Sequence, residues 1–536
     1  MPDRFSTFKV NCQGGLVQNE DVLDLAENFP GAATDLVNFE GDLRGGYRRV
    51  SGYDDFAATA VPTAIIYATS AGVSGAGVYG SAVSLYGTSG VTAGGAVLGV
   101  QIYLSGAIAA RGEHIFYATP GSAWAKISTS GVGLGIEKYR FADFQWTVPS
   151  IIMTNGVGYA LHYSGSTLTT LNTSGAPTNP KFVEEFKQHI FLAGYSSNPN
   201  AIRHSAPNSY TDFNAINGAG EIVVGDEIIN IKRIHNDLLI FCKRSLYRLV
   251  GNSIFDWQLQ KISSTIGSIA PDSIQEYNND LIFLAQDGLR TVAETEKVGD
   301  TELGVLSKPA NIAVTNIIDT YAETGSIASV VVRAKGQYRM FGSLSTLTTA
   351  TQQGIIASRV KEQPGILEWG KLQGFDAYCS DSGYISKTEY VLHGARDGGV
   401  YKQEYGNSFN GSNVYALYVT PQWSFGDPTI RKTLYKLNTY YRLDGSANVT
   451  VGTVLDYNDN SVLQPPNVSF TNQMGVAIYG SAIYGTDIYG GNNFPVTKTN
   501  LIGSGMTAGL IYTSNDINPP YSINALVLQY GTNARR

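Results

Sequence analysis

The chain is poor in charged residues and in Lys/Arg patches. Charged residues make up 15% of its 536 residues, whereas an average soluble protein has about 25%. We therefore expect much of its surface to contact other protein rather than water. The formal net charge is −7 and the basic clusters are small. This balance excludes a protein that holds nucleic acid by neutralising its phosphates.

Cysteine is also scarce. Cys12, Cys242 and Cys379 lie far apart in the sequence, which excludes both a disulfide framework and a zinc pattern. Cys242 lies in an apolar run, so we expect it to behave as a small buried hydrophobic residue. The low cysteine content favours folding in a reducing cytoplasm.

No segment has the pattern of a signal peptide or of a membrane helix. The N-terminus lacks a basic stretch followed by an apolar one. Phe56 to Ala110 carries no charged residue and no histidine, and it is long enough to span a bilayer. Glycines interrupt it repeatedly, however, and a membrane helix needs a continuous apolar run. We interpret it as uncharged β-hairpins, with a Gly/Tyr-rich insertion near residues 70–98.

Glycine and tyrosine are abundant, at 60 and 33 residues. Glycine marks turns, and aromatic residues favour strands. Helical periodicity is scarce, and only Asp21 to Glu27 and Pro180 to Gln188 look able to hold a turn or two of helix. The remaining sequence runs apolar for a few residues and then turns. The pattern predicts an all-β protein with many short strands.

An internal repeat narrows the fold class. The segment Asn236 to Phe241 is echoed at Asn279 to Leu284, and each unit is a polar doublet, an apolar strand, a turn and another strand. A period of about 40–50 residues is typical of a β-propeller, and we expect six to eight irregular blades. The doublets are Gly112-Glu113, Asn155-Gly156, Lys187-Gln188, Asn236-Asp237, Asn279-Asp280, Lys335-Gly336 and Asp397-Gly398.

The pattern changes after residue 405, where longer alternating strands begin. We expect these strands to form a C-terminal β-sandwich-like domain over residues 406–536, after an N-terminal extended segment (1–60) and the propeller (61–405). A Tyr-Gly repeat near 476–495 echoes the uncharged insertion, and the sequence leaves open whether both are adhesive arms or pore-lining loops, or simply extended hairpins. The predicted long strands are Val414 to Trp423, Thr433 to Arg442, Asn448 to Asp456 and Ser522 to Tyr530.

Three short matches to catalytic or cofactor motifs each lack a residue or element that the motif requires. Gly75 to Gly80 fits G-x-G-x-x-G, but strand formers follow it in place of the required helix. Gly365 to Lys371 fits most of a P-loop, but Leu372 stands where a hydroxyl must bind Mg²⁺. Asp456 to Asn460 begins like a calcium loop and lacks its later Gly and Glu. The six histidines show no metal spacing. We predict no catalytic residue, cofactor or metal, and no enzyme.

Ten phrases follow one another in a distinctive order: Gly14 to Leu16, Phe29 to Ala33, Leu36 to Phe39, Gly45 to Tyr53, Pro207 to Phe213, Gly225 to Ile229, Ile240-Phe241, Gly267 to Pro271, Gln286 to Leu289 and Ile523 to Tyr530. They resemble the opening, the centre and the C-terminal end of tail proteins from short-tailed bacteriophages. The family is the tail nozzle, also called tail tubular protein B, with the tail-hub and packaged-DNA-stabilisation propellers as relatives.

The resemblance implies a propeller subunit of the virion tail that assembles as a homohexamer below the portal adaptor. Such a ring forms the distal DNA channel, retains packaged double-stranded DNA, passes it during ejection and docks fibres or spikes. An acidic and uncharged channel would let DNA slide rather than stick. As interface or channel loops we single out the tyrosines of the two Tyr-Gly segments: Tyr79, Tyr86, Tyr479, Tyr484 and Tyr489.

Three other assignments stay open on the sequence, and one of them is a subunit from a long-tailed phage or a cellular surface protein. A glycan- or receptor-binding propeller of a phage particle needs exposed aromatic residues in a pocket at a blade end. The candidates for it are Trp124, Trp146, Trp257, Trp369 and Trp423. A propeller hydrolase is disfavoured because no acid/base or metal signature is present.

Overall fold

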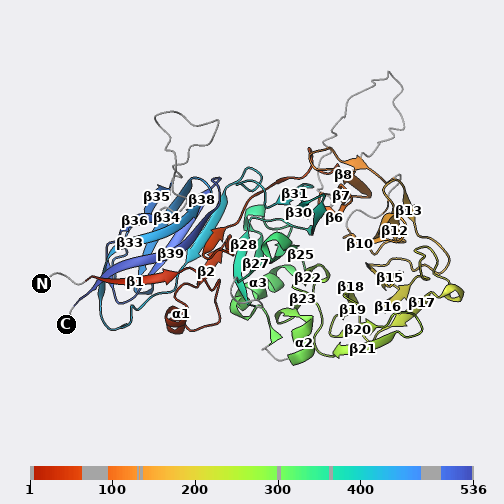
Figure 1. Cartoon of the computed structure of the whole chain (residues 1–536), viewed down its shortest axis with the longest axis horizontal. Helices are drawn as coiled ribbons and strands as arrows, with labels where there is room; N and C mark the ends of the chain where they lie inside the picture. The colour runs from red at the N-terminus through yellow and green to blue at the C-terminus, as the bar shows by residue number, and fades with distance from the viewer. Residues whose placement is uncertain are drawn as a thin grey trace, which may run out of the picture.

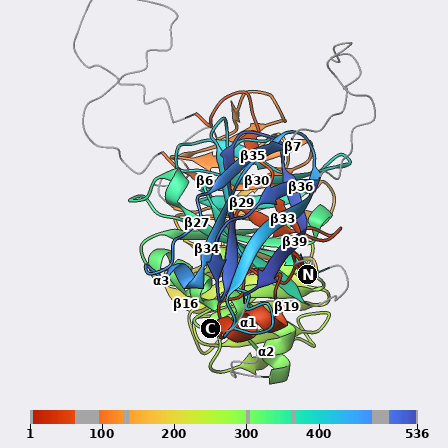
Figure 2. The same cartoon turned by 90° about the vertical axis from the view of Figure 1, so that its left-hand side faces the viewer.

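The computed structural model describes residues 5–62, 95–128, 132, 137–298, 304–360, 366–472 and 496–533. It confirms an all-β fold that combines a propeller with a sandwich. Figure 1 shows the propeller on the right and the C-terminal sandwich on the left along the longest axis. Figure 2 is turned so that the sandwich faces the viewer, with the long paired strands β33 (Lys432–Leu443) and β39 (Tyr521–Thr532) in front of the propeller.

Within the described ranges, six small antiparallel sheets are arranged as propeller blades. In chain order, the first blade consists of β6 (Val97–Tyr103), β7 (Gly106–Arg111), β8 (His114–Ala118) and β9 (Ala125–Lys126). The second consists of β10 (Arg140–Gln145), β11 (Pro149–Thr154), β12 (Leu161–Tyr163) and β13 (Leu168–Thr170). The third consists of β14 (Phe182–Phe186), β15 (His189–Tyr195), β16 (Asn198–His204) and β17 (Gly220–Val223). The fourth blade consists of β18 (Ile228–Ile234), β19 (Asp237–Cys242), β20 (Leu246–Val250) and β21 (Gln258–Ser263). The fifth consists of β22 (Gln275–Tyr277), β23 (Asp280–Ala285) and β24 (Gly288–Thr291). The sixth consists of β29 (Cys379–Ile385), β30 (Thr388–Gly394) and β31 (Val400–Gln403), to which β5 (Tyr53–Asp55) is added.

In most blades the second strand is a buried apolar run. Strands β7 and β15 are buried at every position, and β11, β19 and β23 at every position but the first. These strands are covered on both faces by neighbouring blades, so a continuous apolar sequence suits them better than an alternating one. Cys242, at the end of β19, is fully buried as predicted.

The polar doublets do mark turns and loops between strands, but not the same turn in every blade. Lys187-Gln188 and Asn279-Asp280 lie at the first hairpin of their blades, whereas Gly112-Glu113 and Asp397-Gly398 lie at the second. This difference contributes to the uneven spacing of the doublets. Gly112, Lys187, Gln188, Asn279, Gly336 and Gly398 have positive φ angles, in keeping with tight-turn geometry.

A shared sheet joins the propeller to the sandwich. Strands β25 to β28 lie between the blade β22–β24 and the blade that contains β29, and the same sheet then continues into sandwich strands. The nine strands, in spatial order, are β25 (Ser326–Val332), β26 (Gln337–Ser343), β27 (Gln353–Arg359), β28 (Leu367–Gln373), β2 (Asp35–Val37), β32 (Val414–Val419), β38 (Ala508–Asp516), β34 (Ala447–Leu455) and β35 (Val468–Asn472).

The second sandwich sheet has seven strands. They are β3 (Phe39–Gly41), β4 (Tyr47–Arg49), β39, β33 and β36 (Val496–Asn500), with β1 (Ser6–Asn11) on β39 and β37 (Ser504–Gly505) on β33. Its inner face packs on the nine-stranded sheet through buried residues such as Leu437, Tyr441 and Tyr512. The four long strands predicted after residue 405 are present as β32, β33, β34 and β39.

The N-terminal segment contributes strands to three sheets. Strands β1, β3 and β4 join the seven-stranded sheet, β2 joins the nine-stranded sheet, and β5 pairs with β31 in a blade. The blade that contains β29 is therefore completed by residues far away in the sequence. A propeller closed in this way has fewer free edges, which protects it from edge-to-edge association.

Helices are few among the described residues: α1 (Val22–Asn28), α2 (Val292–Val298) and α3 (Asn311–Tyr321), besides short 3₁₀ turns. The predicted turn of helix at Asp21 to Glu27 is confirmed, and Asp21 caps it by accepting from the Leu23 N–H. The prediction for Pro180 to Gln188 is wrong, because that segment forms the innermost blade strand β14. There Glu184 and Glu185 are held by ion pairs to Lys232 and Arg233 of β18.

Candidate functional site

The centre of the propeller is a narrow polar channel. Its free volume is about 130 Å³, and it is lined by the first strands of the blades and the segments next to them. Lys138 and Arg140 from one side meet Asp272 from another, at 3.0 Å and 2.8 Å. The Arg140 guanidinium also makes a second contact of 3.2 Å with the same carboxylate. These side chains cross the channel and close it.

The carboxylates in this channel respond differently to their surroundings. Burial tends to raise the pKa of Asp272, but the adjacent Arg140 and Lys138 outweigh it and hold that pKa well below its usual range. Burial raises the pKa of Asp381 to about 6, although the Ile102 N–H donates to it at 2.7 Å. The channel is thus a set of satisfied charges around a small void. It has no room for a macromolecule to pass.

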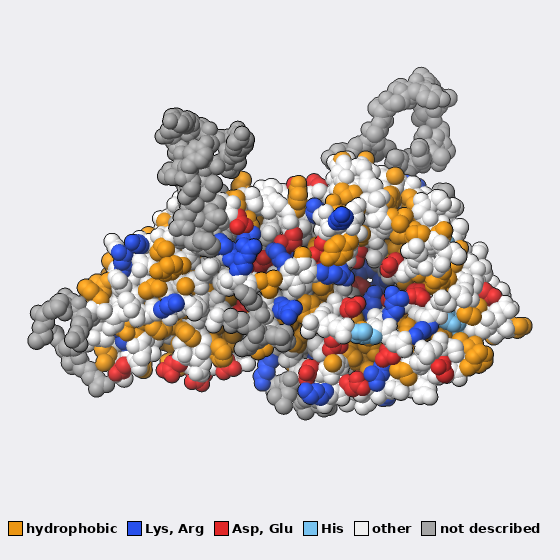
Figure 3. All heavy atoms as spheres, viewed as in Figure 1, with side chains coloured by type: hydrophobic (Ala, Val, Ile, Leu, Met, Phe, Trp, Pro, Cys, Tyr) orange, Lys and Arg blue, Asp and Glu red, His pale blue; other side chains and the backbone are white. Residues whose placement is uncertain are grey.

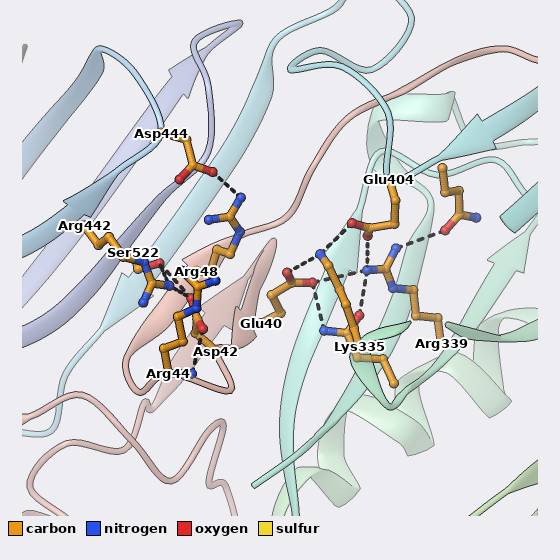
Figure 4. A network of polar contacts seen from close by, with 12 residues as sticks. Glu40, Asp42, Arg44, Arg48, Lys335, Arg339, Glu404, Arg442, Asp444 and Ser522 are labelled. Carbon is orange, nitrogen blue, oxygen red and sulfur yellow. Dashed lines mark hydrogen bonds and ion pairs between the residues drawn. The ribbon is translucent and has the colours of Figure 1, made fainter. Parts of the chain in front are cut away.

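The junction between propeller and sandwich holds a second, larger group of charges (Figure 4). Glu40 of β3 is 3% exposed. It accepts from Lys335 Nζ at 2.6 Å, from Arg339 Nη2 at 3.2 Å and from the Gln337 side-chain amide at 3.0 Å. Glu404, directly after β31, pairs with Lys335 at 2.5 Å and with Arg339. We call Glu40, Lys335, Arg339 and Glu404 the junction cluster.

The junction cluster is electrically balanced, because its two acids face its two bases. Burial tends to raise the pKa of Glu404, but Arg339 and Lys335 dominate and hold it far below the usual glutamate range. Removing one partner from such a buried group leaves an uncompensated charge. The cluster joins β3 of the sandwich, the turn between β25 and β26, and the end of a blade, and so fixes their relative position.

A second group of ion pairs lies beside the junction cluster, within the seven-stranded sheet. Arg48 pairs with Asp444 at 2.5 Å, and Arg442 pairs with Asp42. The Ser522 hydroxyl donates to Asp42 at 3.1 Å. A pocket of about 370 Å³ separates the two groups. Figure 3 shows basic side chains gathered near the middle of the molecule on the visible face.

The sequence contained little local signal for the junction cluster. Glu40 and Arg339 are 299 positions apart, and no motif connects them. Arg339 does interrupt an apolar stretch, between Tyr338 and Met340. An arginine inside a buried strand needs a partner, which was the one available clue.

The tyrosines singled out from the sequence, Tyr79, Tyr86, Tyr479, Tyr484 and Tyr489, lie outside the described residues, as do most of the insertion near 70–98 and the arm near 476–495. Among the tryptophans, Trp124, Trp369 and Trp423 are buried, and Trp146 and Trp257 are partly exposed.

No group of three or more His, Cys, Asp and Glu side chains in the described ranges is placed to hold a metal ion. In the same part of the chain, no helix has the length and apolar character needed to cross a bilayer.

No protein-family model and no curated protein matches this chain. Solved structures with a similar arrangement of strands include the extracellular domain of a one-component system of B. thetaiotaomicron, at 11% identity over 63% of this chain and 42% of that one, with a TM-score of 0.37. Another is PorZ, a surface component of the type-IX secretion system of Porphyromonas gingivalis, at 10% identity, 62% and 42% coverage and a TM-score of 0.34. A third is the WD40 domain of Neurospora crassa Pan2, at 8% identity, 58% and 90% coverage and a TM-score of 0.35.

The chain thus spans about two fifths of the length of the two bacterial proteins that it matches. None of these three proteins is a phage tail protein by name. At these TM-scores the likeness carries no argument about function.

Proposed function

We propose that this chain is a structural subunit of a short-tailed bacteriophage tail, a nozzle protein rather than an enzyme. Copies of it, six in the family that it resembles, form the distal DNA channel below the portal adaptor. The ring retains packaged DNA, passes it during ejection and docks fibres or spikes. The protein folds in the host cytoplasm and resides in the virion tail.

The observation that carries the proposal is the way the N-terminal segment holds two domains together. The phrases that resemble the phage family, such as Gly14 to Leu16 and Leu36 to Phe39, lie where the N-terminal segment contacts the sheet that the two domains share. Gly15 donates from its N–H to the Tyr47 hydroxyl at 2.9 Å, and Leu16 donates to the Trp369 carbonyl at 2.7 Å. With the shared sheet and the junction cluster, these contacts make one stiff body. A stiff body suits a part that bears load.

The closed propeller channel places a condition on the proposal. Lys138, Arg140 and Asp272 fill the centre of the propeller, so DNA cannot run through an individual subunit. The conduit has to lie between copies, on their outer surfaces. Retention of DNA is then a property of the assembled ring.

A subunit of a ring also needs surfaces that contact its neighbours. The outer edge of the propeller carries Ile216 and Phe255, which are 91% and 93% exposed. Val223 of β17 and Leu259 of β21 are also exposed, on the outermost strands of adjacent blades. The two loops touch, since a Cβ added at Gly218 would lie 3.4 Å from Cδ1 of Ile254. We call Ile216, Val223, Phe255 and Leu259 the rim patch. Exposed apolar patches of this kind are typical of interaction sites.

Immunogold electron microscopy of purified virions, with antibody against this chain, tests the proposal. We expect one patch of label per particle, at the distal end of a short tail, and none with pre-immune serum. Six-fold averaging of labelled tails would then locate the subunits. Label over the capsid or on fibre tips, or its absence from particles, would overturn the nozzle proposal.

A further inference from the structure

One face of the propeller carries an open pocket of about 500 Å³. It is built where the first strands of successive blades end: β6 at Tyr103, β10 at Gln145, β14 at Phe186 and β18 at Ile234. The turns that follow these strands form its walls. This volume is in the range of small-molecule sites, about 300–1,000 Å³.

Several polar side chains that line the pocket lack a hydrogen-bonding or ion-pair partner among the described residues. Asp143 and Gln145 of β10 and Gln188 of the β14–β15 turn are exposed and line the pocket. In the part of the chain that the structure describes, their carboxylate and amide groups make no hydrogen bond or ion pair, although Asp143 raises the pKa of the nearby Glu184. Glu185, in contrast, is engaged: it pairs with Arg233 and accepts from the Gln188 N–H at 3.0 Å.

The remaining wall of the pocket is apolar and partly aromatic. Trp146 is half-buried and packs against Phe144, with ring centroids 4.7 Å apart. Across from the polar groups, Leu104 is 53% exposed, in the tight turn between β6 and β7. Both side chains border the pocket, so a ligand with an apolar face has a surface on which to lie.

We propose that this pocket binds a neutral oligosaccharide. A sugar ring has an apolar C–H face, which suits the indole of Trp146, and a rim of hydroxyls. Adjacent hydroxyls are matched by planar carboxylate and amide groups, because these offer acceptors and donors side by side. Asp143, Gln145 and Gln188 supply such groups. A pocket with an aromatic wall and a few convergent polar side chains is the common form of a ligand site.

The charges of the pocket select against acidic sugars. Asp143 and Glu185 are acidic, and Arg233, the basic residue that lines it, is already paired with Glu185. Asp143 is left without a counter-ion, so a carboxylated or sulfated sugar would be repelled. Neutral hexoses and N-acetylhexosamines meet no such penalty.

Binding of the purified full-length chain to a printed array of neutral and acidic bacterial glycans tests the proposal. We expect binding to one or more neutral glycans and weaker binding to their acidic counterparts. Titration calorimetry with the best neutral glycan then compares variants. Asp143→Ala and Gln188→Ala should each lower the affinity about tenfold, as expected when a hydrogen bond to a ligand is lost. Trp146→Ala should abolish detectable binding.

The controls separate loss of binding from loss of fold. Asp143 and Gln188 are exposed, so their variants should unfold at the urea concentration of the wild type. Asp319→Ala, at an exposed aspartate on α3, should bind as the wild type does. Absence of glycan binding, preference for acidic glycans, or wild-type affinity in both Asp143→Ala and Gln188→Ala would overturn the proposal. Since the pocket does not belong to the junction or to the rim patch, these outcomes are independent of the nozzle proposal.

Discussion

The guanidinium of Arg339 meets the carboxylate of Glu40 at 3.2 Å, across a separation of 299 residues. Both side chains are almost completely buried, at 1% and 3% exposure. One belongs to the propeller end of the shared sheet and the other to the seven-stranded sheet of the sandwich. Their contact therefore ties the relative position of the two domains to the stability of each.

Glu40→Gln should lower the free energy of unfolding by about 3 kcal/mol, because it leaves the buried Arg339 and the partly exposed Lys335 with one carboxylate between them. Urea unfolding followed by far-UV circular dichroism measures this change. Asp444→Asn, which breaks the exposed pair with Arg48, should cost less than about 1 kcal/mol. Equal effects of the two substitutions would show that the junction cluster does not hold the domains together.

Acid should destabilise the protein, and His393 should contribute strongly. Burial lowers the pKa of His393 to about 3, with Asp397 acting weakly against it. The unfolded chain takes up this proton near pH 6.5 while the folded chain does not, so stability is lost as pH falls below about 6.5. At pH 5 the loss from this group is about 2 kcal/mol. His204, whose pKa burial lowers to about 4, acts in the same direction.

Urea unfolding at pH 7.5 and pH 5.0 checks this prediction. His393→Asn should show a drop in stability between the two pH values that is smaller by about 2 kcal/mol than that of the wild type. His235→Asn, at an exposed histidine, should keep the wild-type drop. If His393→Asn loses as much stability between the two pH values as the wild type does, ionisable groups other than His393 govern the response to acid.

The thiols should not react in the native protein. Cys12, Cys242 and Cys379 are free and buried, and burial raises the pKa of each to about 12. Since the thiolate is the reactive form, a disulfide reagent at pH 8 should modify none of them until urea is added, and then all three. Rapid reaction of one thiol in native buffer would contradict the packing described around it.

The strands and turns were predictable from the sequence because their signals are local. The alternation over Thr433 to Arg442 predicted β33 to within a residue or two at each end. The prediction of helix over Pro180 to Gln188 was wrong because this segment is strand β14, in which Glu184 and Glu185 pair with cations of the next blade. Helix α3 was missed although Ala313, Val314 and Ile317 face the core at helical spacing.

The junction cluster and the propeller pocket were not predictable, since each gathers residues from distant segments. Glu40 and Glu404 meet the same two cations from opposite ends of the propeller sequence. Nothing near either residue in the sequence predicts the other. Such sites depend on closure of the ring by β5 and on the sheet that the two domains share.

The rim patch should mediate self-association. Phe255→Ser combined with Ile216→Ser removes two side chains that are more than nine-tenths exposed, so the fold should be unaffected and contacts between copies should weaken. Sedimentation velocity at increasing concentration should show association of the wild type and a monomer for the variant. Leu463→Ser, at an equally exposed leucine outside the propeller, is the control. If the wild type stays monomeric, or if the double variant associates as strongly as the wild type, the rim patch is not a contact between subunits of the proposed ring.

At Gly15 the N-terminal segment lies directly against the backbone of strand β28 in the shared sheet. Its φ angle is +66°, and a Cβ there would lie 2.6 Å from the backbone nitrogen of Trp369. Gly45 also has a positive φ, +92°, but a Cβ there meets nothing within 4 Å. Gly45→Ala should therefore cost only the left-handed backbone conformation, about 1 kcal/mol. Gly15→Ala adds a steric clash worth about 1–3 kcal/mol more.

Comparing the two glycine variants separates the contact with the shared sheet from the backbone effect, because both positions have a positive φ angle. Urea unfolding should rank the wild type first, Gly45→Ala second and Gly15→Ala last. If the N-terminal segment holds the two domains as one body, Gly15→Ala should also separate the single transition into two, because the segment loses its contact with the shared sheet at Trp369. A single transition with equal costs for both glycines would show that the segment lies on the shared sheet without supporting it.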